Sequence, residues 1–560
     1  MKIFLAQQNY HVGNFEANTA QIIAAIEEAK GQGGDLIVFS ELSVCGYAPK
    51  DFLEFDDFIN KSYAALDQIK MHADGIGVLV GAPDRNPVKE GKDLFNAAFL
   101  LYDKKIQGVA HKTCLPNYDV FDEYRYFEPA YDWKVMLFKG KRLAITICED
   151  IWNLGDNPLY RNCPMDELMK QSPDVMINLS ASPFDYTHDA DRKATIKANV
   201  TKYKLPLFYC NAVGSQTGIV FDGSSLVFDK GANLCGRLSA FESSLQSFEL
   251  NDDGSISSPI IESANLLPDQ ELNPLVLDEH LNIEMIYQAL VMGIRDYFAK
   301  MGFTKAILGS SGGIDSAVTL VLACEALGKE NVRAILLPSQ FSTGHSVSDA
   351  EQLSQQVGNP YDIVPIKNVY DTFLTTLSPI FKDLPFGLAE ENIQSRTRGN
   401  ILMGIANKFG YILLNTSNKS ELATGYGTLY GDMAGGLAVL GDCYKLQVYA
   451  LAAFINQSKE IIPQHIITKP PSAELRPGQV DADSLPDYAV LDKVLYQYIE
   501  RRQGPNEIKA QGYNPELVDK VLRMVNRNEY KRNQFCPIIR VSPKAFGEGR
   551  RVPIVGNYLS

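Results

Sequence analysis

Three residues with complementary chemistry each stand at the expected end of a strand in the first part of the chain. Glu41 follows the apolar run LIVF, Lys112 closes a hairpin, and Cys148 follows the run LAITI. A thiol is mostly protonated near neutral pH, so it needs a neighbouring base, and a carboxylate can serve. A lysine ammonium beside it would stabilise the oxyanion of a tetrahedral intermediate. The set therefore predicts a nucleophilic thiol.

A second set of chemical groups lies in the segment GSSGGIDS, which follows the apolar run KAIL and precedes a helix-like stretch. Gly312 and Gly313 permit close approach of the backbone, and a helix N-terminus faces an anion there. The lysine of a Walker loop is missing, and Asp315 stands in the cradle instead, which favours a magnesium ion carried with phosphates. Further hydroxyl donors come from Ser310, Ser311 and Ser316.

The elements expected around the first set mix helices with hairpins, which predicts an α/β sandwich with helices outside and sheets inside. The expected strands are residues 2–7, 35–39 and 75–81, with a helix at 20–30 and hairpins that turn at 103–105 and 230–231.

The second set lies in a regular alternation of strands and helices, which predicts a doubly wound parallel sheet with ligands beyond the carboxyl ends of its strands. After a helix at 283–300, the expected strands are 305–308, 332–337, 363–366 and 411–415, and the expected helices are 315–327, 346–357 and 392–409.

A chain of 560 residues exceeds the size at which one hydrophobic core keeps growing, so at least two domains are expected. We expect a first domain over residues 1–245 and a second over 281–560 that includes a C-terminal tail. Residues 246–280 are rich in Ser, Asn, Asp and Pro and are predicted to be a connector.

The composition of the chain limits the classes of partner that it can bind. The net charge of −14 argues against nucleic acid or an anionic membrane, and we find no apolar run long enough to span a bilayer. The start lacks the pattern of a signal peptide, and the nine cysteines have no regular spacing. We expect a cytoplasmic protein that binds small molecules.

The loop SGGIDS, between a strand and a helix, resembles the pyrophosphate-binding loop of the N-type ATP pyrophosphatase superfamily. The resemblance implies that ATP is cleaved between its α and β phosphates to adenylate a carboxylate or carbonyl. The ATP-binding residues that it implies are Gly309, Ser310, Ser311, Gly312, Gly313, Ile314, Asp315 and Ser316, together with Thr416 and Lys445.

Within that superfamily, NTSNKSELATGYGTLYGDMAGG and ENIQSRTR resemble the NAD synthetase family. The resemblance implies that Glu421 joins Asp315 on magnesium. The residues that it implies for deamido-NAD are Asn392, Arg396, Glu421, Asp432 and Lys531.

The segments FSELSVCGYAP, HKTCLPN and ICEDIW resemble the nitrilase superfamily, which splits amides through a thioester. The resemblance makes Cys148 the nucleophile, Glu41 the general base and Lys112 the oxyanion stabiliser. His111 and His188 are interpreted as bystanders. The expected glutamine-binding residues are Tyr118, Glu123, Ser182 and Arg192, and the cysteines expected to be structural are Cys45, Cys114, Cys163, Cys210 and Cys235.

Together the two halves resemble the glutamine-dependent NAD synthetases, which implies ammonia from glutamine, an acyl adenylate made from ATP and deamido-NAD, Mg²⁺, and a homo-oligomer. Two alternatives stay open: the same ammonia transfer to another acceptor, and an amidase whose second half only binds nucleotide as a regulatory module.

Overall fold

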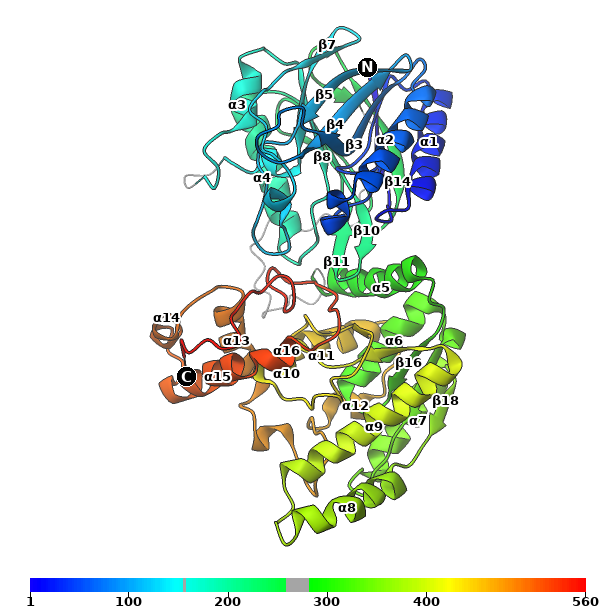
Figure 1. The fold of residues 1–560 in the computed structure, drawn as a ribbon, viewed down its shortest axis with the longest axis vertical. Coiled ribbons are helices and arrows are strands. Elements are labelled where there is room, and N and C mark those ends of the chain that lie inside the picture. Colours follow the sequence, from blue (N-terminus) through cyan, green and yellow to red (C-terminus); the bar gives the residue numbers. More distant parts are fainter. Residues whose placement is uncertain (155–157, 258–281, 560) are drawn as a thin grey trace. The chain divides into compact units, whose positions relative to one another are not determined.

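The computed structural model describes residues 1–154, 158–257 and 282–559, and it divides into two compact units, Met1–Glu271 and Leu272–Ser560 (Figure 1). Each unit has its own sheets and core. Both predicted fold types are confirmed, and each unit is described separately below.

Two mixed sheets form the first unit. In spatial order the seven-stranded sheet contains β15 (Ile256–Ser257), β14 (Ser244–Leu250), β1 (Lys2–Gln7), β2 (Leu36–Val38), β3 (Gly77–Arg85), β4 (Leu94–Tyr102) and β5 (Lys105–His111). The six-stranded sheet contains β13 (Leu234–Arg237), β12 (Leu226–Phe228), β9 (Leu207–Asn211), β8 (Val175–Ser180), β7 (Lys141–Ile147) and β6 (Met136–Phe138). A separate ribbon pairs β10 (Val213–Gln216) with β11 (Ile219–Asp222).

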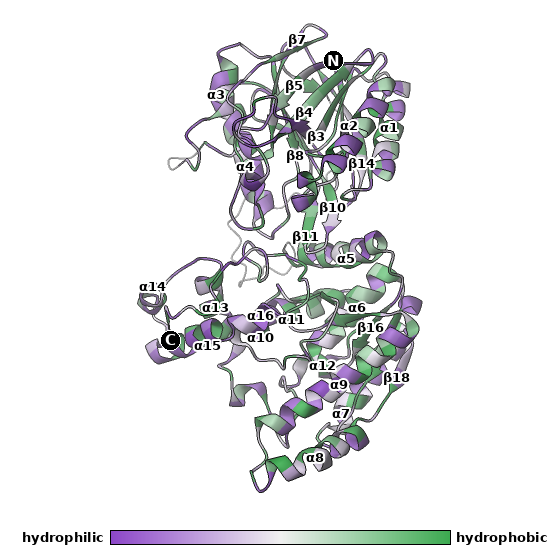
Figure 2. Ribbon diagram, viewed as in Figure 1, coloured by the Kyte–Doolittle hydropathy of each residue, from purple (hydrophilic) through white to green (hydrophobic). Residues whose placement is uncertain are grey.

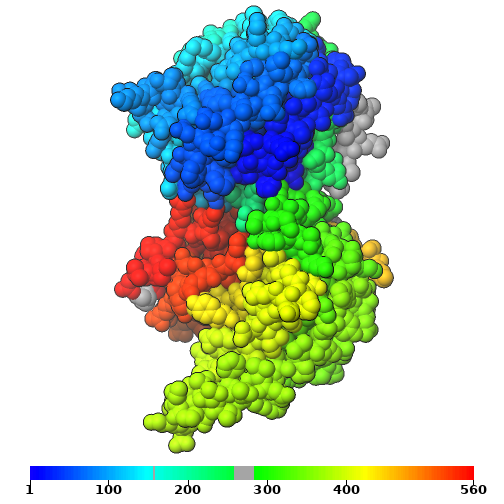
Figure 3. All heavy atoms as spheres, turned by 45° about the vertical axis from the view of Figure 1, so that its right-hand side comes forward, coloured from blue at the N-terminus to red at the C-terminus, as the bar shows by residue number. Residues whose placement is uncertain are grey.

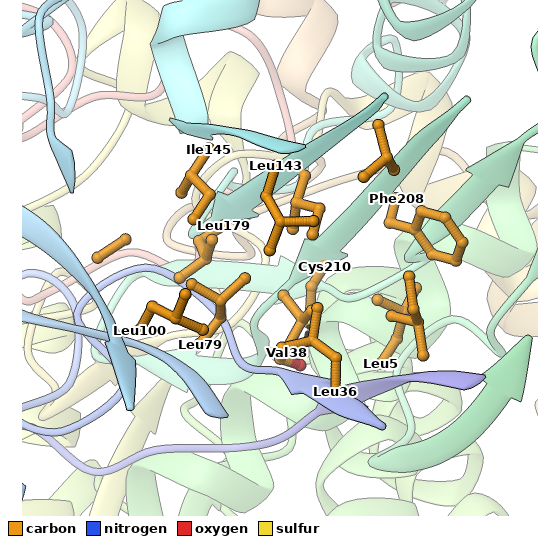
Figure 4. Close-up of a cluster of buried hydrophobic side chains, with 14 of the residues drawn as sticks. Leu5, Leu36, Val38, Leu79, Leu100, Leu143, Ile145, Leu179, Phe208 and Cys210 are labelled. Carbon is orange, nitrogen blue, oxygen red and sulfur yellow. Dashed lines mark hydrogen bonds between the residues drawn. The ribbon is translucent and has the colours of Figure 1, made fainter. Parts of the chain in front are cut away.

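The side chains between the two sheets form a continuous apolar core (Figure 4). Leu5 and Val38 come from one sheet, and Leu143, Leu179 and Phe208 come from the other. Because side chains alternate along a strand, the neighbours Phe4 and Ile37 face the opposite side of their sheet. Each sheet is therefore apolar on both faces.

Helices cover the outer faces of both sheets. These helices are α1 (Phe15–Gly31), α2 (Asp56–His72), α3 (Pro164–Met169) and α4 (His188–Tyr203). Ile22 and Ile69 pack on the first sheet, and Leu168 and Ile196 pack on the second. Purple and green patches alternate on α1 and α2 in Figure 2, as expected for helices with one buried face. The layers follow the predicted order of helix, sheet, sheet, helix.

Part of the expected connector is strand instead. Residues 246–250 belong to β14, which pairs antiparallel with β1, and residues 256–257 form β15. Phe248 and Leu250 are almost fully buried, an alternation that the sequence analysis overlooked among the polar residues. The remainder of the expected connector, 258–280, lies outside the described residues.

The second unit is built on a five-stranded parallel sheet. In spatial order it contains β18 (Tyr361–Ile363), β17 (Val332–Leu336), β16 (Ala306–Gly309), β19 (Ile412–Asn415) and β20 (Leu437–Ala438). Its main helices are α5 (Asn282–Met301), α6 (Ile314–Leu327), α7 (Gly344–Val357), α8 (Lys367–Phe381) and α9 (Leu388–Phe409). The order reverses at β16, which is the switch point where doubly wound sheets bind ligands.

One strand of this sheet was predicted wrongly. Residues 363–366 were expected to form a strand, whereas β18 ends at Ile363. β18 is an edge strand whose three residues are all at least partly exposed, so it lacks the apolar run that identifies a buried strand.

The C-terminal region adds a helical layer with a core of its own. Its helices are α10 (Lys419–Thr424), α11 (Lys445–Ile455), α12 (Gln464–Thr468), α13 (Tyr488–Ile499), α14 (Pro505–Ala510), α15 (Pro515–Arg527) and α16 (Glu529–Arg532). Leu422 of α10 packs in one cluster with Leu491 and Leu522. Across the described ranges, no helix combines the length and apolarity that crossing a bilayer requires.

Candidate active sites

Cys148 begins a tight turn at the end of β7. The turn η3 (Cys148–Ile151) starts directly after Ile147, and the Cys148 backbone has φ of +43°, a left-handed conformation that is costly for a residue with a Cβ. The side chain is buried. A strand that ends in such a turn directs the thiol to the edge of the sheet, as the sequence analysis expected.

Asp150 ties this turn to the segment that carries Lys112. Its Oδ1 accepts from the backbone amides of Thr113 (3.0 Å) and Cys114 (2.8 Å), and its Oδ2 accepts from the amide of Ile147 (3.0 Å). One buried carboxylate thus fixes two strand ends from different sheets against each other.

Lys112 lies between two glutamates. Its Nζ donates to Oε1 of Glu41 (2.7 Å) and to Oε1 of Glu123 (2.8 Å), and the lysine side chain has no exposed surface. Burial lowers the pKa of Lys112, but the charges of Glu123 and Glu41 outweigh it, so the pKa lies well above its usual value. Lys112 is therefore an ammonium at neutral pH. Burial and then the charge of Glu41 raise the pKa of the Cys148 thiol, so the sulfur needs a base.

Two further side chains hold these glutamates. The Asn96 amide donates to Oε1 of Glu41 (2.7 Å) and to Oε2 of Glu123 (3.3 Å), and the Tyr47 hydroxyl donates to Oε1 of Glu123 (2.7 Å). The backbone amide of Ala181 donates to the other oxygen of Glu41 (3.0 Å). Glu123 was expected to bind glutamine, but its carboxylate is bonded to Lys112, Tyr47 and Asn96. Its contacts favour a role in orienting Lys112.

Tyr118 approaches the residue after the nucleophile. Its hydroxyl lies 3.0 and 3.1 Å from the two carboxylate oxygens of Glu149. Burial raises the pKa of the Glu149 carboxyl to about 7. A half-exposed tyrosine and an acid beside the thiol can line a pocket for a small polar substrate.

Ser182 and Arg192 have different surroundings. The Ser182 hydroxyl lies 2.7 Å from Nε2 of His188, whose ring stacks on Trp152 at 5.0 Å. Arg192 is fully buried and donates to both oxygens of Asp222 at 2.9 and 2.8 Å. The expected binding of a substrate carboxylate by Arg192 therefore conflicts with its contacts, since a buried ion pair of this geometry already occupies the guanidinium.

The predicted phosphate loop joins β16 to α6. Gly312 has φ of +76°, and a Cβ there would lie 2.2 Å from the carbonyl oxygen of Ser346, so only glycine fits. The hydroxyls of Ser311 and Ser316 lie 3.2 Å apart, and Ser311 accepts from the amide of Gly313. The Ser310 hydroxyl is buried and has no hydrogen-bond partner among the described residues. The loop presents amides and hydroxyls at the start of a 14-residue helix.

Both carboxylate oxygens of Asp315 accept hydrogen bonds. Its Oδ1 accepts from Nδ2 of Asn418 (2.9 Å) and its Oδ2 accepts from Nζ of Lys445 (2.5 Å). The Lys445 ammonium also lies 3.8 Å from Oε1 of Glu421. Burial and the charge of Asp315 raise the pKa of Glu421 well above its usual value. The structure thus brings together the two carboxylates and the lysine that the sequence analysis named.

Of the five residues expected to bind the dinucleotide, four meet at one segment, 425–432, while Glu421 lies beside Asp315 and Lys445. The Thr428 hydroxyl donates to the amide oxygen of Asn392 (2.7 Å), and Nε of Arg396 donates to the carbonyl of Leu429 (3.2 Å). Lys531 donates to two carbonyls of the segment, at 2.8 Å each, and Asp432 accepts from the amide of Thr428. Thr416 follows the last residue of β19, near the same edge of the sheet.

Several of these neighbours were missed from the sequence. Asp150 and Glu149 follow Cys148 directly in ICEDIW, and Asn418 precedes Glu421 by one helical turn, so their places in the quoted motifs were the available signal. Tyr47 stands in the quoted motif FSELSVCGYAP, so it had the same signal, whereas Asn96 approaches from β4 and nothing in the local pattern marks it.

The folds and sites define a two-unit enzyme in which a thiol amidohydrolase is joined to an ATP-dependent ligase. The family model for carbon-nitrogen hydrolases matches residues 2–254, and the model for NAD synthases matches residues 286–535. A relative named glutamine-dependent NAD(+) synthetase from Synechocystis is 42% identical over 99% of this chain and 98% of its own length. One of the same name from Thermotoga maritima is 38% identical over 100% and 99%. The chain belongs to the family of glutamine-dependent NAD(+) synthetases.

Solved structures of other proteins agree with this family assignment. A glutamine-dependent NAD+ synthetase from Acinetobacter baumannii, solved in complex with ADP, is 37% identical with a TM-score of 0.77, covering 99% of this chain and 98% of that one. The corresponding protein from Cytophaga hutchinsonii has a TM-score of 0.81 at 20% identity over the same shares, which supports the fold.

Proposed function

We propose that the protein converts deamido-NAD to NAD with ATP, Mg²⁺ and glutamine. ATP and the nicotinate carboxylate give an acyl adenylate and pyrophosphate, and ammonia from glutamine then displaces AMP. The observation that carries the proposal is the convergence of Asp315, Glu421 and Lys445 beside a phosphate-binding loop, on a chain whose other unit holds Cys148 near a buried glutamate and lysine.

The first half-reaction releases ammonia. Glu41 takes the thiol proton, and the Cys148 sulfur attacks the amide carbon of glutamine to form a tetrahedral intermediate. The Lys112 ammonium stabilises its oxyanion, because a buried positive charge acts strongly in a site with little water. Glu41 returns the proton to the leaving nitrogen, ammonia departs, and a thioester remains. Water, deprotonated by Glu41, then releases glutamate and the free thiol.

Glutamine is held at both of its α-substituents. We assign the α-ammonium to Glu149, whose carboxylate Tyr118 holds with its hydroxyl. We assign the α-carboxylate to Ser182 and His188, since Arg192 is engaged by Asp222. His188 then binds substrate, contrary to its interpretation as a bystander.

Magnesium fits the donor set of the second unit. Mg²⁺ prefers carboxylate oxygens and substrate phosphates, and a divalent cation would stabilise the ionised form of Glu421, a partly buried acid whose pKa is raised by desolvation and by Asp315. Asp315 and Glu421 would hold the ion, which would offset the charge on the phosphates. The chain itself supplies the remaining cations and donors: the loop residues 309–316, Lys445 and Thr416 for ATP.

The nicotinate half of the substrate must reach the same loop. We assign deamido-NAD to the segment 425–432 and to the groups that contact it, Asn392, Arg396, Asp432 and Lys531. Arg396 is exposed and carries the positive charge that a dinucleotide attracts. We also propose that the protein works in the cytoplasm, where ATP and glutamine are abundant.

A second copy of the chain is the proposed occupant of an apolar surface around α8. The end of α8, the loop after it and the start of α9 carry exposed apolar side chains, and in Figure 3 this yellow-green segment projects from the surface of its unit. They are Ile380 (72% exposed), Leu384 (74%), Phe386 (51%) and Leu388 (71%). Such a patch is unusual on a surface that stays in water. Leu384→Lys should convert the oligomer to smaller species in sedimentation velocity, whereas Met301→Lys should not. A monomeric wild-type protein would refute the proposal.

The acceptor is tested by pyrophosphate release. The purified protein receives ATP, Mg²⁺ and glutamine with either deamido-NAD, nicotinate mononucleotide or free nicotinate. The proposal predicts rapid release of pyrophosphate with deamido-NAD and formation of NAD. If another acceptor gave faster release of pyrophosphate, the proposed ammonia transfer would stand, but deamido-NAD would not be the substrate. Glutamine hydrolysis without any pyrophosphate would instead favour an amidase with a regulatory nucleotide module.

A further inference from the structure

A buried acid outside the proposed site joins two of its helices. Asp492, in the first turns of α13, has no exposed surface. Its Oδ1 accepts from the Ser420 hydroxyl of α10 (2.5 Å), and its Oδ2 accepts from the backbone amide of Leu446 in α11 (2.9 Å). Burying a carboxylate between neutral donors is costly, because the charge loses its hydration. Asp492 therefore does more than fill space in an apolar core.

The two helices also touch each other directly at this point. The Ser420 hydroxyl oxygen accepts from the backbone amide of Lys445 (3.0 Å), so its own proton is available for Asp492. Ser420 is fully buried. The first turns of α10 and α11 are thus joined through one hydroxyl and one carboxylate.

The same two first turns hold the metal-binding aspartate. Asn418, which caps α10, donates to one oxygen of Asp315, and Lys445, the first residue of α11, donates to the other. The contacts form a closed ring: Asp492 to Ser420, α10 to Asp315 through Asn418, Asp315 to Lys445, and α11 back to Asp492. Without Asp492 the direct bond from the Lys445 amide to Ser420 remains, but Leu446 loses its tie to α10, so α10 and α11 can shift relative to Asp315.

We propose that Asp492 is a positioning residue of the synthetase site, which sets the separation of Glu421 and Lys445 around Asp315 by bridging α10 and α11. The inference rests on the proposed roles of those three residues. α10 has six residues, and so short a helix takes its orientation from tertiary contacts. Asp492 acts through Ser420 and Leu446 and needs no contact with substrate.

The test compares two replacements of Asp492 in the full-length protein. Asp492→Asn keeps one acceptor for Leu446 and places an amide against the Ser420 oxygen, so the bridge survives. Asp492→Leu keeps the volume and removes both bonds. With ammonium as the donor, we expect Asp492→Leu to lower kcat at least about tenfold and to raise the Mg²⁺ concentration for half-maximal rate several-fold, because misplacement by about 1 Å costs up to about 10²-fold. Asp492→Asn should stay within about threefold of wild type.

Matched controls separate positioning from general destabilisation. Asn456 lies just beyond the far end of α11 and accepts from the amides of Ile461 and Ile462 at 2.9 and 2.8 Å, so Asn456→Leu removes as many acceptor bonds next to that helix, together with one donor bond to the Ile462 carbonyl. It should lower the melting temperature and leave the Mg²⁺ dependence unchanged. Glutamine hydrolysis, which uses the other unit, reports the fraction of active protein.

The outcomes are distinct. Unchanged kcat and Mg²⁺ dependence in Asp492→Leu, or an equal loss in Asp492→Asn, would overturn the inference. Should Asp492→Leu fail to fold, Ser420→Ala breaks the same bridge at its other end and must raise the Mg²⁺ requirement; if it does not, the inference is wrong. If the wild-type protein itself forms no NAD, the proposed function fails instead.

Discussion

Lys112→Met tests the cluster that couples the buried lysine to two acids. In the wild type, Nζ lies 2.7 and 2.8 Å from Glu41 and Glu123, and at an effective dielectric constant of about 20 each attraction is about 6 kcal/mol before desolvation is subtracted. The variant leaves two buried carboxylates without their cation, which costs about 3–5 kcal/mol. The folded variant has a lower free energy if one of the two glutamates takes up a proton on folding, because this removes one buried charge.

This proton uptake makes the stability of the variant depend on pH in a defined way. Burial raises the pKa of Glu123, so Glu123 is the acid that takes up this proton in the variant. Protonating a carboxylate whose ordinary pKa is about 4.3 costs about 5 kcal/mol at pH 8 and about 2 kcal/mol at pH 6. The folded variant then binds one more proton than its unfolded chain, so the stability gap to wild type shrinks by about 1.4 kcal/mol for each unit by which the pH falls.

The assay is urea denaturation of both proteins at pH 6, 7 and 8, together with initial rates. Glutamine hydrolysis should fall about 10²–10³-fold, because the oxyanion loses its donor. Synthesis from ammonium should persist, since it uses the other unit. Lys61→Met is the control: its pair with Asp57 has the same 2.7 Å distance but is 61% and 78% exposed, so it should cost less than about 1 kcal/mol. A gap for Lys112→Met no larger than that of the control, or one that does not change with pH, would refute the reasoning.

Other predictions follow from the division between the two sites. Cys148→Ala should abolish glutamine-supported NAD formation while ammonium still supports it, and equal failure with both donors would contradict separate sites. Asp315→Asn should abolish synthesis from either donor, whereas retained synthesis would favour a regulatory nucleotide module. Glu421→Gln should lower synthesis from both donors and leave some glutamine hydrolysis; loss of hydrolysis alone would contradict its role. Burial raises the pKa of Glu149 to about 7, and the ionised form is the one that binds an ammonium, so kcat/KM for glutamine should fall as pH falls through about 7. Glu149→Gln should remove this dependence of kcat/KM on pH near 7. An unchanged pH profile would contradict the assignment of Glu149 to the α-ammonium.

The strands that carry the chemistry were predictable because apolar runs and motif residues coincide. β7 ends at Ile147, as the run LAITI indicated, and β16 ends at Gly309, one residue beyond the run KAIL. Cys148 and the remainder of the phosphate loop follow directly. The polar composition of residues 246–257 predicts a connector, whereas residues 246–250 belong to β14, which pairs with β1 across more than 200 residues of sequence. Such pairing is set by the whole sheet and not by local composition.

The sequence predicts the chemistry of the cluster around Lys112 but only some of the residues that form it. Glu41 and Lys112 stand in recognisable motifs, whereas Asn96 comes from β4, and only the tertiary fold brings its amide to both glutamates. Arg192 shows the opposite error. An arginine near the expected pocket looked free to bind a carboxylate, but Asp222 of β11 neutralises it, and only the tertiary fold brings those two residues together.

The central claim is that an oxygen of the substrate acid leaves with AMP. Deamido-NAD with ¹⁸O at both oxygens of its nicotinate carboxylate is incubated with the protein, ATP, Mg²⁺ and ammonium, and the AMP is examined by mass spectrometry. The account predicts one ¹⁸O atom in the phosphate of each AMP formed, with an equal amount of NAD. NAD formed together with unlabelled AMP, or with ADP and inorganic phosphate, would contradict it.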